Sequence, residues 1–263
     1  MHIRQHPSPG SIRSSRTLGN RVWSGAAGDD AALNLTLATI GSNCIMYLPL
    51  WHKDANDHST GANNGTVVET DNLYFGNNGL VGLTAGEAGN CITLTPDADF
   101  NMGTNDFTMA GWIKVGAALA SQIDLFFLHG DGGIVCNFYI GTDYLLHVQL
   151  EDGSPSPINL TGSTTLGSDT WYFLAFRFDR SAYTDGNPFP YGLSINMVSE
   201  ELSYGPADYT GSSLNFNGSC LAVNSHVGRV AELYWWNDLL TTSALASIYN
   251  TNAVAFSKSL ADI

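Results

Sequence analysis

The stretch GRVAELYWWNDLLTTSALASIYN, residues 228–250, decides how the rest of this sequence is interpreted. It places an acidic residue, Glu232, inside a strand-like run, follows it with three aromatic residues and then changes to a helical pattern. Three interpretations are open on this stretch alone: an active site, a sugar-binding face, or the closing element of a β-sandwich. The remainder of the chain has to discriminate between them.

The composition favours a globular all-β chain. The 263 residues are 44% hydrophobic, which is enough for a substantial core, and only 13% are charged. The 28 glycines, together with many Ser, Thr, Asn and Asp residues, separate short apolar runs. This pattern is typical of many strands joined by turns rather than of long helices.

The N-terminal segment differs in charge from the rest of the chain. Residues 1–22 hold four arginines and no acidic residue and so carry +4; since the whole chain carries −14, residues 23–263 carry −18. Apolar periodicity is absent from this segment, so residues 1–30 are predicted to form an extended basic arm that cannot fold alone. The arginines predicted to bind a partner are Arg4, Arg13, Arg16 and Arg21.

The expected partner of this arm is an acidic surface, because guanidinium groups pair with carboxylates or phosphates in bidentate geometry. Other protein chains of an assembly fit this description, including further copies of the same chain as a homo-oligomer. Nucleic acid is not favoured, because no aromatic residues interleave the arginines and the acidic body would repel phosphates. The alternative is an ordinary frayed terminus.

Export and membrane signals are not recognised in the sequence. No apolar stretch with a small-residue cleavage site follows the N-terminal arginines, and no run is long and apolar enough to span a bilayer. The cysteines are far apart and lie within or beside apolar segments, which is typical of buried free thiols rather than of a disulfide framework or a zinc site. These cysteines are Cys44, Cys91, Cys136 and Cys220.

A series of short strands is predicted along the body of the chain. WYFLAFRFD (171–179) has the clearest period of two, with Tyr172, Leu174, Phe176 and Phe178 on one face and Trp171, Phe173, Ala175 and Arg177 on the other. The other predicted strands are CIMYLPLW (44–51), DNLYF (71–75), CITLT (91–95), FTMAGWIKV (107–115), IDLFFLHG (123–130), GIVCNFYIG (133–141), YLLHVQLED (144–152), YGLSINMV (191–198) and SCLAVN (219–224). Short strands without alternating helices indicate two packed antiparallel sheets.

Four motifs, in order, resemble those of laminin-G-like, concanavalin A-like jelly rolls. YLPLWHKDANDHSTGANNGTV (47–67) resembles the opening strand and the Gly- and Asn-rich segment after it, and FTMAGWIKV resembles the strand with Phe-Thr and Trp. LGSDTWYFLAFRFDR (166–180) resembles the strand that begins with Trp-Tyr, and the stretch over 228–250 is similar to the terminal motif of the family. The resemblance covers about residues 43–250.

This resemblance implies an all-β fold, a two-sheet antiparallel jelly-roll sandwich with an extended N-terminal arm and a short C-terminal helix. The expected organisation is the arm over 1–30, a linker or first strand over 31–42, the jelly roll over 43–250 and a tail over 251–263. Residues 228–250 then have mainly a structural role: they form the last strand, followed by a helix that Thr242 or Ser243 caps. The expected core residues are Trp112, Trp171, Val230, Leu233 and Trp235, and the expected docking residues of the helix are Leu245, Ile248 and Tyr249.

A calcium ion is one expectation that the resemblance adds. Some relatives bind structural calcium with oxygens from the last strand and from the Asp-rich loop after the first, which corresponds here to Glu232 and Asp57. Asp54, Asn63 and Asn64 offer further hard oxygen ligands of the type that calcium requires. The alternative is that these Asp and Asn residues only form an exposed turn.

Catalysis is not predicted. The relatives that hydrolyse glycans carry carboxylates at alternate positions of one strand, and no Glu-x-Asp-x-x-Glu occurs in this sequence. Glu200 and Glu201 would point to opposite faces of a strand, and Glu151 and Asp152 are expected at a turn. The histidines show no HExxH spacing, and no GxSxG surrounds a serine.

The sequence therefore predicts a non-enzymatic structural protein of a larger assembly. Resembling jelly rolls occur in tail, fibre and capsid-decorating proteins of bacterial viruses, so the expected location is a virion, where the sandwich displays a face that binds polysaccharide. The alternatives are a free carbohydrate-binding module and, third, a glycan-cleaving enzyme. Candidate aromatic platforms for a sugar are Trp51, Tyr74, Tyr139, Tyr144, Tyr183, Tyr204 and Tyr209.

Overall fold

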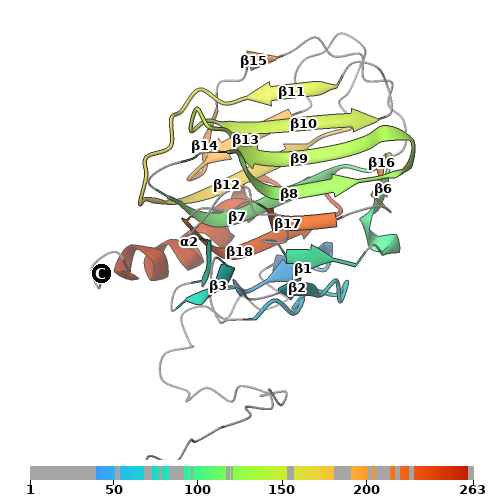
Figure 1. Ribbon diagram of the computed structural model, residues 1–263. Helices are drawn as coiled ribbons and strands as arrows, with labels where there is room; N and C mark the ends of the chain where they lie inside the picture. Colours follow the sequence, from blue (N-terminus) through green and yellow to red (C-terminus); the bar gives the residue numbers. More distant parts are fainter. Residues whose placement is uncertain are drawn as a thin grey trace, which may run out of the picture.

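The computed structural model has two large antiparallel sheets packed face to face and one helix near the C-terminus (Figure 1). It describes residues 40–50, 54–67, 73–76, 79–82, 92–95, 97–116, 119, 121–152, 157–180, 191–200, 203–204, 214–216, 220–224 and 228–259. This arrangement confirms the predicted all-β sandwich. The predicted arm over 1–30 lies outside the described residues.

The first sheet has eight strands among the described residues, in the spatial order β14-β13-β12-β7-β18-β4-β3, with β1 also paired to β18. The bounds are β1 Cys44–Leu48, β3 Leu73–Gly76, β4 Gly79–Gly82, β7 Phe107–Val115, β12 Trp171–Phe178, β13 Tyr191–Ile195, β14 Val198–Ser199 and β18 Gly228–Trp236. Strand β7 lies between β12 and β18, so three of the four recognised motifs are neighbours at the centre of this sheet.

The second sheet also has eight strands in the described part of the chain, in the order β15-β11-β10-β9-β8-β17-β5-β2. The bounds are β2 Gly65–Val67, β5 Ile92–Leu94, β8 Ile123–His129, β9 Ile134–Ile140, β10 Leu146–Asp152, β11 Ile158–Thr161, β15 Ser203–Tyr204 and β17 Cys220–Asn224. Strands β8 to β11 are consecutive antiparallel neighbours, whereas β17 enters between β8 and β5 from a distant part of the sequence.

Smaller elements complete the described fold. Strands β6 Asn101–Gly103 and β16 Leu214–Asn215 form a two-stranded sheet. Two short 3-10 helices span Ala98–Phe100 and Asp131–Gly133, and the helix α2 spans Thr242–Ser259. Among the described residues, no helix combines the length and the apolar character needed to cross a membrane.

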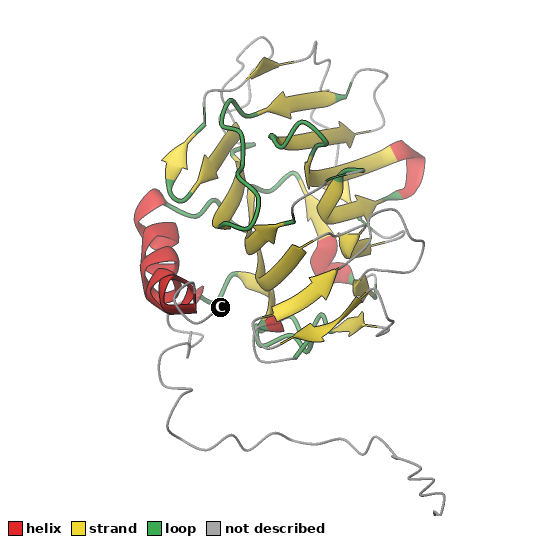
Figure 2. Ribbon diagram, turned by 60° about the vertical axis from the view of Figure 1, so that its left-hand side comes forward, coloured by secondary structure: helices red, strands yellow, loops and turns green. Residues whose placement is uncertain are grey.

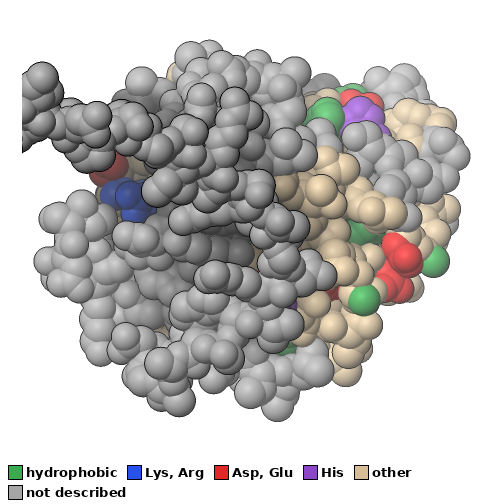
Figure 3. All heavy atoms as spheres, turned by 60° about the horizontal axis from the view of Figure 1, so that its bottom comes forward, with side chains coloured by type: hydrophobic (Ala, Val, Ile, Leu, Met, Phe, Trp, Pro, Cys, Tyr) green, Lys and Arg blue, Asp and Glu red, His purple; other side chains and the backbone are tan. Residues whose placement is uncertain are grey.

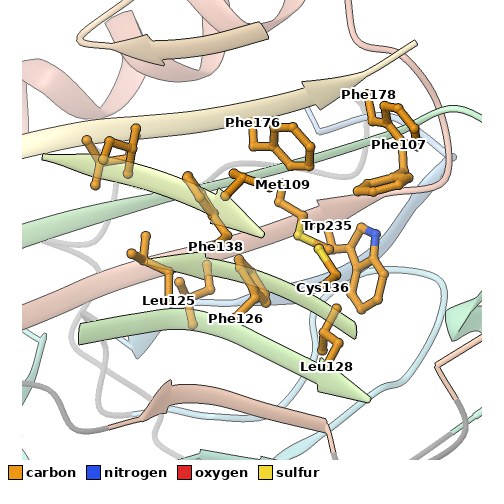
Figure 4. Packing of buried hydrophobic residues seen from close by; sticks show 14 of the residues in the cluster. Phe107, Met109, Leu125, Phe126, Leu128, Cys136, Phe138, Phe176, Phe178 and Trp235 are labelled. Carbon is orange, nitrogen blue, oxygen red and sulfur yellow. The ribbon is translucent and has the colours of Figure 1, made fainter. Parts of the chain in front are cut away.

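The main core fills the space between the two sheets. Phe126 and Phe138 of the second sheet face Phe176 and Trp235 of the first sheet (Figure 4). Trp235 is fully buried and its ring stacks on that of Phe100, with centroids 4.8 Å apart. Burial of these aromatic side chains removes a large apolar area from water and is the main source of stability for the sandwich.

Helix α2 lies beside the first sheet (Figure 2), and a second apolar layer fills the space between the helix and the face of this sheet opposite the main core. Tyr249 of the helix stacks on Trp112 of β7, with ring centroids 5.5 Å apart and planes at 9°. Trp112 and Trp171 are buried as predicted, but they belong to this layer and not to the core that contains Trp235. The two tryptophans lie in this second layer because helix α2 covers the outer face of the first sheet, so that both faces of the sheet are buried.

Strand β18 contributes side chains to both apolar layers, and its register with strand β7 changes once. Val230, Leu233 and Trp235 lie in the main core, as predicted, although Val230 and Leu233 are an odd number of residues apart. A β-bulge between Val230 and Glu232 adds one residue and restores the alternation. Tyr234 and Trp236 then face helix α2.

The start and the end of α2 differ from the prediction. The Oγ1 of Thr241 accepts a hydrogen bond from the Ala244 amide at 3.2 Å, so Thr241 caps the helix rather than Thr242 or Ser243. Leu245 and Ile248 are buried against the sheet, as expected. The helix continues through Ser259, so most of the predicted tail over 251–263 is helical.

Cys44 and Cys136 are buried free thiols, and burial raises the pKa of each to about 12. Cys91 lies outside the described residues and the side chain of Cys220 is not described. Glu151 and Asp152, which were expected at a turn, form the end of strand β10.

Candidate functional site

The outer face of the second sheet, opposite the main core, carries the candidate site. Alternation along β8, β9, β10 and β11 points hydrophobic residues into the core and polar or aromatic residues outward. One outward row crosses the four strands, because Asp124 pairs with Tyr139, Tyr139 with His147, and His147 with Thr161. This row is called the tyrosine row below.

The centre of the tyrosine row is a rigid pair of rings. Tyr139 and His147 are half-buried and stack with centroids 5.0 Å apart and planes at 10°. Both nitrogens of His147 have partners: Nε2 lies 3.0 Å from Oδ1 of Asp143, and Nδ1 lies 3.0 Å from Oγ1 of Thr161. Since the imidazole is held on both sides, it fixes the orientation of the Tyr139 ring.

Carboxylates surround this ring pair. Partial burial raises the pKa of Tyr139, and the negative charges of Asp143 and Asp124 raise it further. Burial alone would raise the pKa of Asp143, but its hydrogen bonds with His147 and with the Leu145 amide outweigh burial and lower it. Asp143 is therefore ionised at neutral pH and serves as a hydrogen-bond acceptor beside the aromatic pair.

A second outward row runs beside the first. Phe127 of β8 pairs with Asn137 of β9, which pairs with Gln149 of β10. The ring of His129 contacts Phe127 edge-on, with centroids 4.4 Å apart. Asn137 is only 3% exposed, and neither its Oδ1 nor the Nε2 of His129 has a hydrogen-bond partner among the described residues.

Thr161, His147 and Asp143 place a hydroxyl, an imidazole and a carboxylate in series, which is the order found in nucleophilic hydrolases. Such chemistry also requires free amides to stabilise an oxyanion. The three amides after Thr161 are all occupied: that of Gly162 donates to the Leu146 carbonyl at 2.8 Å, and those of Ser163 and Thr164 donate to Glu200. The geometry is suited to binding rather than to acyl transfer.

Asp57 organises the loop between β1 and β2. Its two carboxylate oxygens accept four hydrogen bonds, from the amides of Tyr47, Ser59 and Asn63 and from the Ser59 hydroxyl, at 2.6–2.9 Å. Asn63 in turn donates to the Ile45 carbonyl at 2.7 Å. These contacts hold the loop against strand β1 and occupy the lone pairs of Asp57.

Glu232 lies in a separate, fully buried polar cluster beneath helix α2. Its carboxylate accepts hydrogen bonds from the hydroxyls of Tyr47 and Tyr234 and from the Asn252 amide of α2. The Tyr47 and Tyr234 rings stack with centroids 4.8 Å apart. Burial raises the pKa of Glu232 to about 8, although the two tyrosine hydrogen bonds oppose this shift. These four residues are called the Glu232 cluster below.

Comparison with known families decides the classification. The family model described as the concanavalin A-like lectin/glucanase superfamily, of laminin-G type, matches residues 86–246, more than half of the chain. The chain belongs to this laminin-G-like family. The match covers two of the four motifs on which the sequence resemblance rested in full, and residues 228–246 of the terminal one. No protein among the curated sequences matches the chain.

Solved structures share the fold of this laminin-G-like chain at low sequence identity. The binding domain of Paraclostridial Mosquitocidal Protein 1 has a TM-score of 0.60 and 15% identity, covering 81% of this chain and 53% of that one. A structure of botulinum neurotoxin type C, concerned with its interaction with two ganglioside molecules, has a TM-score of 0.58 and 14% identity, with coverages of 82% and 53%. This chain thus spans about half the length of either toxin chain.

A third structure corresponds over nearly its whole length. Domain 4 of AbnA, a GH43 extracellular arabinanase from Geobacillus stearothermophilus, was solved in complex with arabinotriose. It has a TM-score of 0.56 and 18% identity, and the similarity covers 79% of this laminin-G-like chain and 98% of that domain. At such identities these likenesses establish the fold alone.

Most predicted site residues of the laminin-G-like chain are either separated or undescribed. Arg4, Arg13, Arg16 and Arg21 lie outside the described residues, as do Trp51, Tyr183 and Tyr209, and the side chains of Tyr74 and Tyr204 are not described. Tyr144 accepts a hydrogen bond from the Leu119 amide at 3.2 Å. Of the aromatic candidates, Tyr139 is the one that the structure places in a polar row on the outer face.

The partners of Tyr139 are not evident from the sequence alone. His147 has no HExxH spacing to another histidine, although the alternation of His147, Gln149 and Glu151 with leucine and valine marks an outward face. Asp143 and Thr161 could not be assigned to it, because their proximity depends on the register of three strands.

Calcium is not expected to stabilise the folded chain. Asp57 and Glu232 contact opposite ends of Tyr47, the amide and the hydroxyl, and no group of three or more His, Cys, Asp or Glu side chains within the described residues is arranged to hold a metal ion. We therefore expect the same melting temperature in excess chelator and in excess calcium, measured by calorimetry. A higher melting temperature with calcium would instead support the calcium hypothesis, because a ligand of the folded state stabilises it.

Proposed function

We propose that this chain is a non-enzymatic carbohydrate-binding protein and that the outer face of the second sheet is its binding surface. The observation that carries the proposal is the fixed Tyr139–His147 ring pair beside the exposed carboxylate of Asp143. A sugar ring offers an apolar face to an aromatic side chain and hydroxyls to carboxylates and amides. The tyrosine row supplies both kinds of contact on one rigid sheet.

Two of the solved structures support this proposal. The arabinanase domain was obtained with arabinotriose, and the type C neurotoxin study concerns ganglioside molecules. Fold likeness by itself does not assign a ligand, so the proposal stands on the side chains of the outer face. The occupied amides after Thr161 favour binding over hydrolysis at the same place.

The predicted role in a virion rests on residues 1–30, which lie outside the described residues, and it remains a prediction. The carbohydrate-binding proposal does not depend on it, because the outer face belongs to the sandwich. A sandwich displayed by an assembly and a free module would use the same surface.

Replacement of Tyr139 tests the proposal. Tyr139→Ala removes the aromatic platform, so we expect affinity for a bound polysaccharide to fall at least tenfold, or about 1.4 kcal/mol. Tyr139→Phe retains the ring and is expected to retain most of the affinity. The measurement is isothermal titration against an oligosaccharide chosen from a glycan array.

The matched control is Val198→Ala on strand β14 of the first sheet, where the side chain is 68% exposed. It should leave both affinity and stability unchanged. If Tyr139→Ala binds the oligosaccharide as tightly as the parent protein while its fold is intact, the binding surface lies elsewhere.

A further inference from the structure

The two sheets of the sandwich differ in charge. The strands of the second sheet contain Asp124, Glu151 and Asp152 and no Lys or Arg, and the sequence has no Lys or Arg at all between Lys114 and Arg177. The strands of the first sheet contain the basic residues Lys114, Arg177 and Arg229 and one acidic residue, Glu232. Figure 3 views the lower end of the molecule, where one described basic patch lies at the left beside an acidic side chain, and further acidic and histidine side chains lie at the right.

The negative charge of the second sheet acts at the tyrosine row itself. Asp124 and Asp143 lie close enough to Tyr139 to disfavour a further negative charge on its hydroxyl. Glu151 extends the same face and accepts a hydrogen bond from Gln149 at 2.7 Å. A carboxylate or sulfate that approached this row would therefore meet repulsion and no guanidinium or ammonium group on these strands to pair with it.

A second observation is a buried amide oxygen on this face that lacks a hydrogen-bond donor. The amide oxygen of Asn137, a side chain only 3% exposed, has no donor among the described residues, and it lies in the row next to Tyr139 on the same face. A buried acceptor without a donor costs about 1–3 kcal/mol. This oxygen is closed off from solvent, so a ligand would reach it only after neighbouring side chains of the face move; a hydroxyl could then donate to it, whereas the carboxylate or sulfate group of an anionic saccharide could not.

We infer that the glycan bound by the outer face of the second sheet is uncharged. This inference rests on the proposed function and adds the chemical class of the ligand: a neutral pentose or hexose polymer, rather than a sialylated, uronic or sulfated one. Its hydroxyls donate to the solvent-accessible carboxylates of Asp143 and Glu151, and its ring stacks on Tyr139.

Matched pairs of saccharides test the inference. The full chain is titrated with arabinotriose as a neutral saccharide. It is also titrated with polygalacturonate against its methyl-esterified form and with sialyllactose against its methyl ester, so that the members of each pair differ chiefly in the charge of their carboxyl groups. We expect at least one neutral saccharide to bind, and its anionic counterpart to bind at least tenfold more weakly. The difference should shrink at high salt, because screening weakens exposed charge interactions.

A substitution that adds a positive charge tests whether the preference for neutral saccharides arises at this face. Asn159 is exposed on strand β11, where it pairs with Gln149 of the outer face, so Asn159→Lys adds a positive charge to this face. We expect it to improve binding of the anionic counterpart severalfold. The control Ser199→Lys adds the same charge to an exposed position of β14 in the first sheet and should leave the ratio unchanged.

The possible outcomes separate the two claims. The inference is supported if the parent protein prefers neutral saccharides and Asn159→Lys reduces that preference. Preference of the parent protein for an anionic saccharide overturns the inference and leaves the carbohydrate-binding proposal intact. Failure to bind any saccharide, neutral or anionic, overturns the proposed function and the inference with it.

Discussion

Trp235→Ala is expected to destabilise the folded chain by about 3–5 kcal/mol. Trp235 is fully buried between the sheets, stacks on Phe100 and contacts the rings of Phe126 and Phe216 at 6.0–6.2 Å between centroids. Truncation removes the contacts of a large aromatic side chain and leaves a cavity between two rigid sheets that cannot collapse to fill it. Chemical denaturation of the purified variant and the parent protein measures the difference.

Two conservative variants accompany this measurement. The Nε1 of Trp235 has no hydrogen-bond partner within the described residues, so Trp235→Phe loses packing but no hydrogen bond. The Nε1 of Trp236 donates to the Ile40 carbonyl at 2.7 Å, so Trp236→Phe also leaves a buried carbonyl without its donor. A Trp235→Ala variant as stable as the parent protein would mean that the register of strand β18 is shifted by one residue.

The Glu232 cluster gives the second large effect, a loss of stability as the pH rises. The pKa of Glu232 is raised from an ordinary value of 4.5 to about 8, so the folded state retains a proton that the unfolded state releases. Its contribution to stability is fully present below about pH 4.5 and is lost as the pH rises to about 8. The shift corresponds to roughly 5 kcal/mol over this interval.

Glu232→Gln isolates this contribution, because the amide resembles the protonated acid in shape and cannot ionise. We expect the variant to match the parent protein near pH 4.5 and to be more stable by several kcal/mol at pH 9, as measured by denaturant unfolding at each pH. Tyr47 and Tyr234 face the carboxylate from β1 and β18, and burial raises the pKa of both hydroxyls, so neither ionises in this range.

Glu151 is the control, because its replacement removes a carboxylate that is not fully buried. Glu151→Gln removes the same charge from the half-buried end of strand β10, outside the Glu232 cluster. It should not reproduce the gain at pH 9. Parallel stability profiles of Glu232→Gln and the parent protein between pH 4.5 and 9 would contradict a buried, proton-retaining Glu232.

The strands were predictable because local alternation specifies their faces. Leu174 and Phe176 lie in the main core while Trp171 and Phe173 lie under the helix, as the period of two in WYFLAFRFD indicates. The β-bulge before Glu232 was not predictable, because it is defined by the partner strand β7 rather than by the letters of β18. The same holds for Trp112, whose place under α2 depends on where a distant helix docks.

The candidate site was less predictable than the fold. Tyr139 was named as one of several aromatic platforms, but its environment is assembled from Asp124, His147 and Thr161 on three other strands. Local patterns indicate that such residues point outward and do not indicate which of them are neighbours. Asp57 and Glu232 were expected to share a cation, yet strand β1 gives each of them different hydrogen-bond donors.

The uneven distribution of lysine has a practical consequence for immobilisation. The lysines of the chain are Lys53, Lys114 and Lys258, and none of them lies within the bounds of a described strand of the second sheet. Amine coupling to a biosensor surface or to a dye therefore attaches the protein at positions outside those strands. The immobilised protein should present its tyrosine row to the solution, so surface-based glycan assays can use coupling through native lysines without an engineered tag.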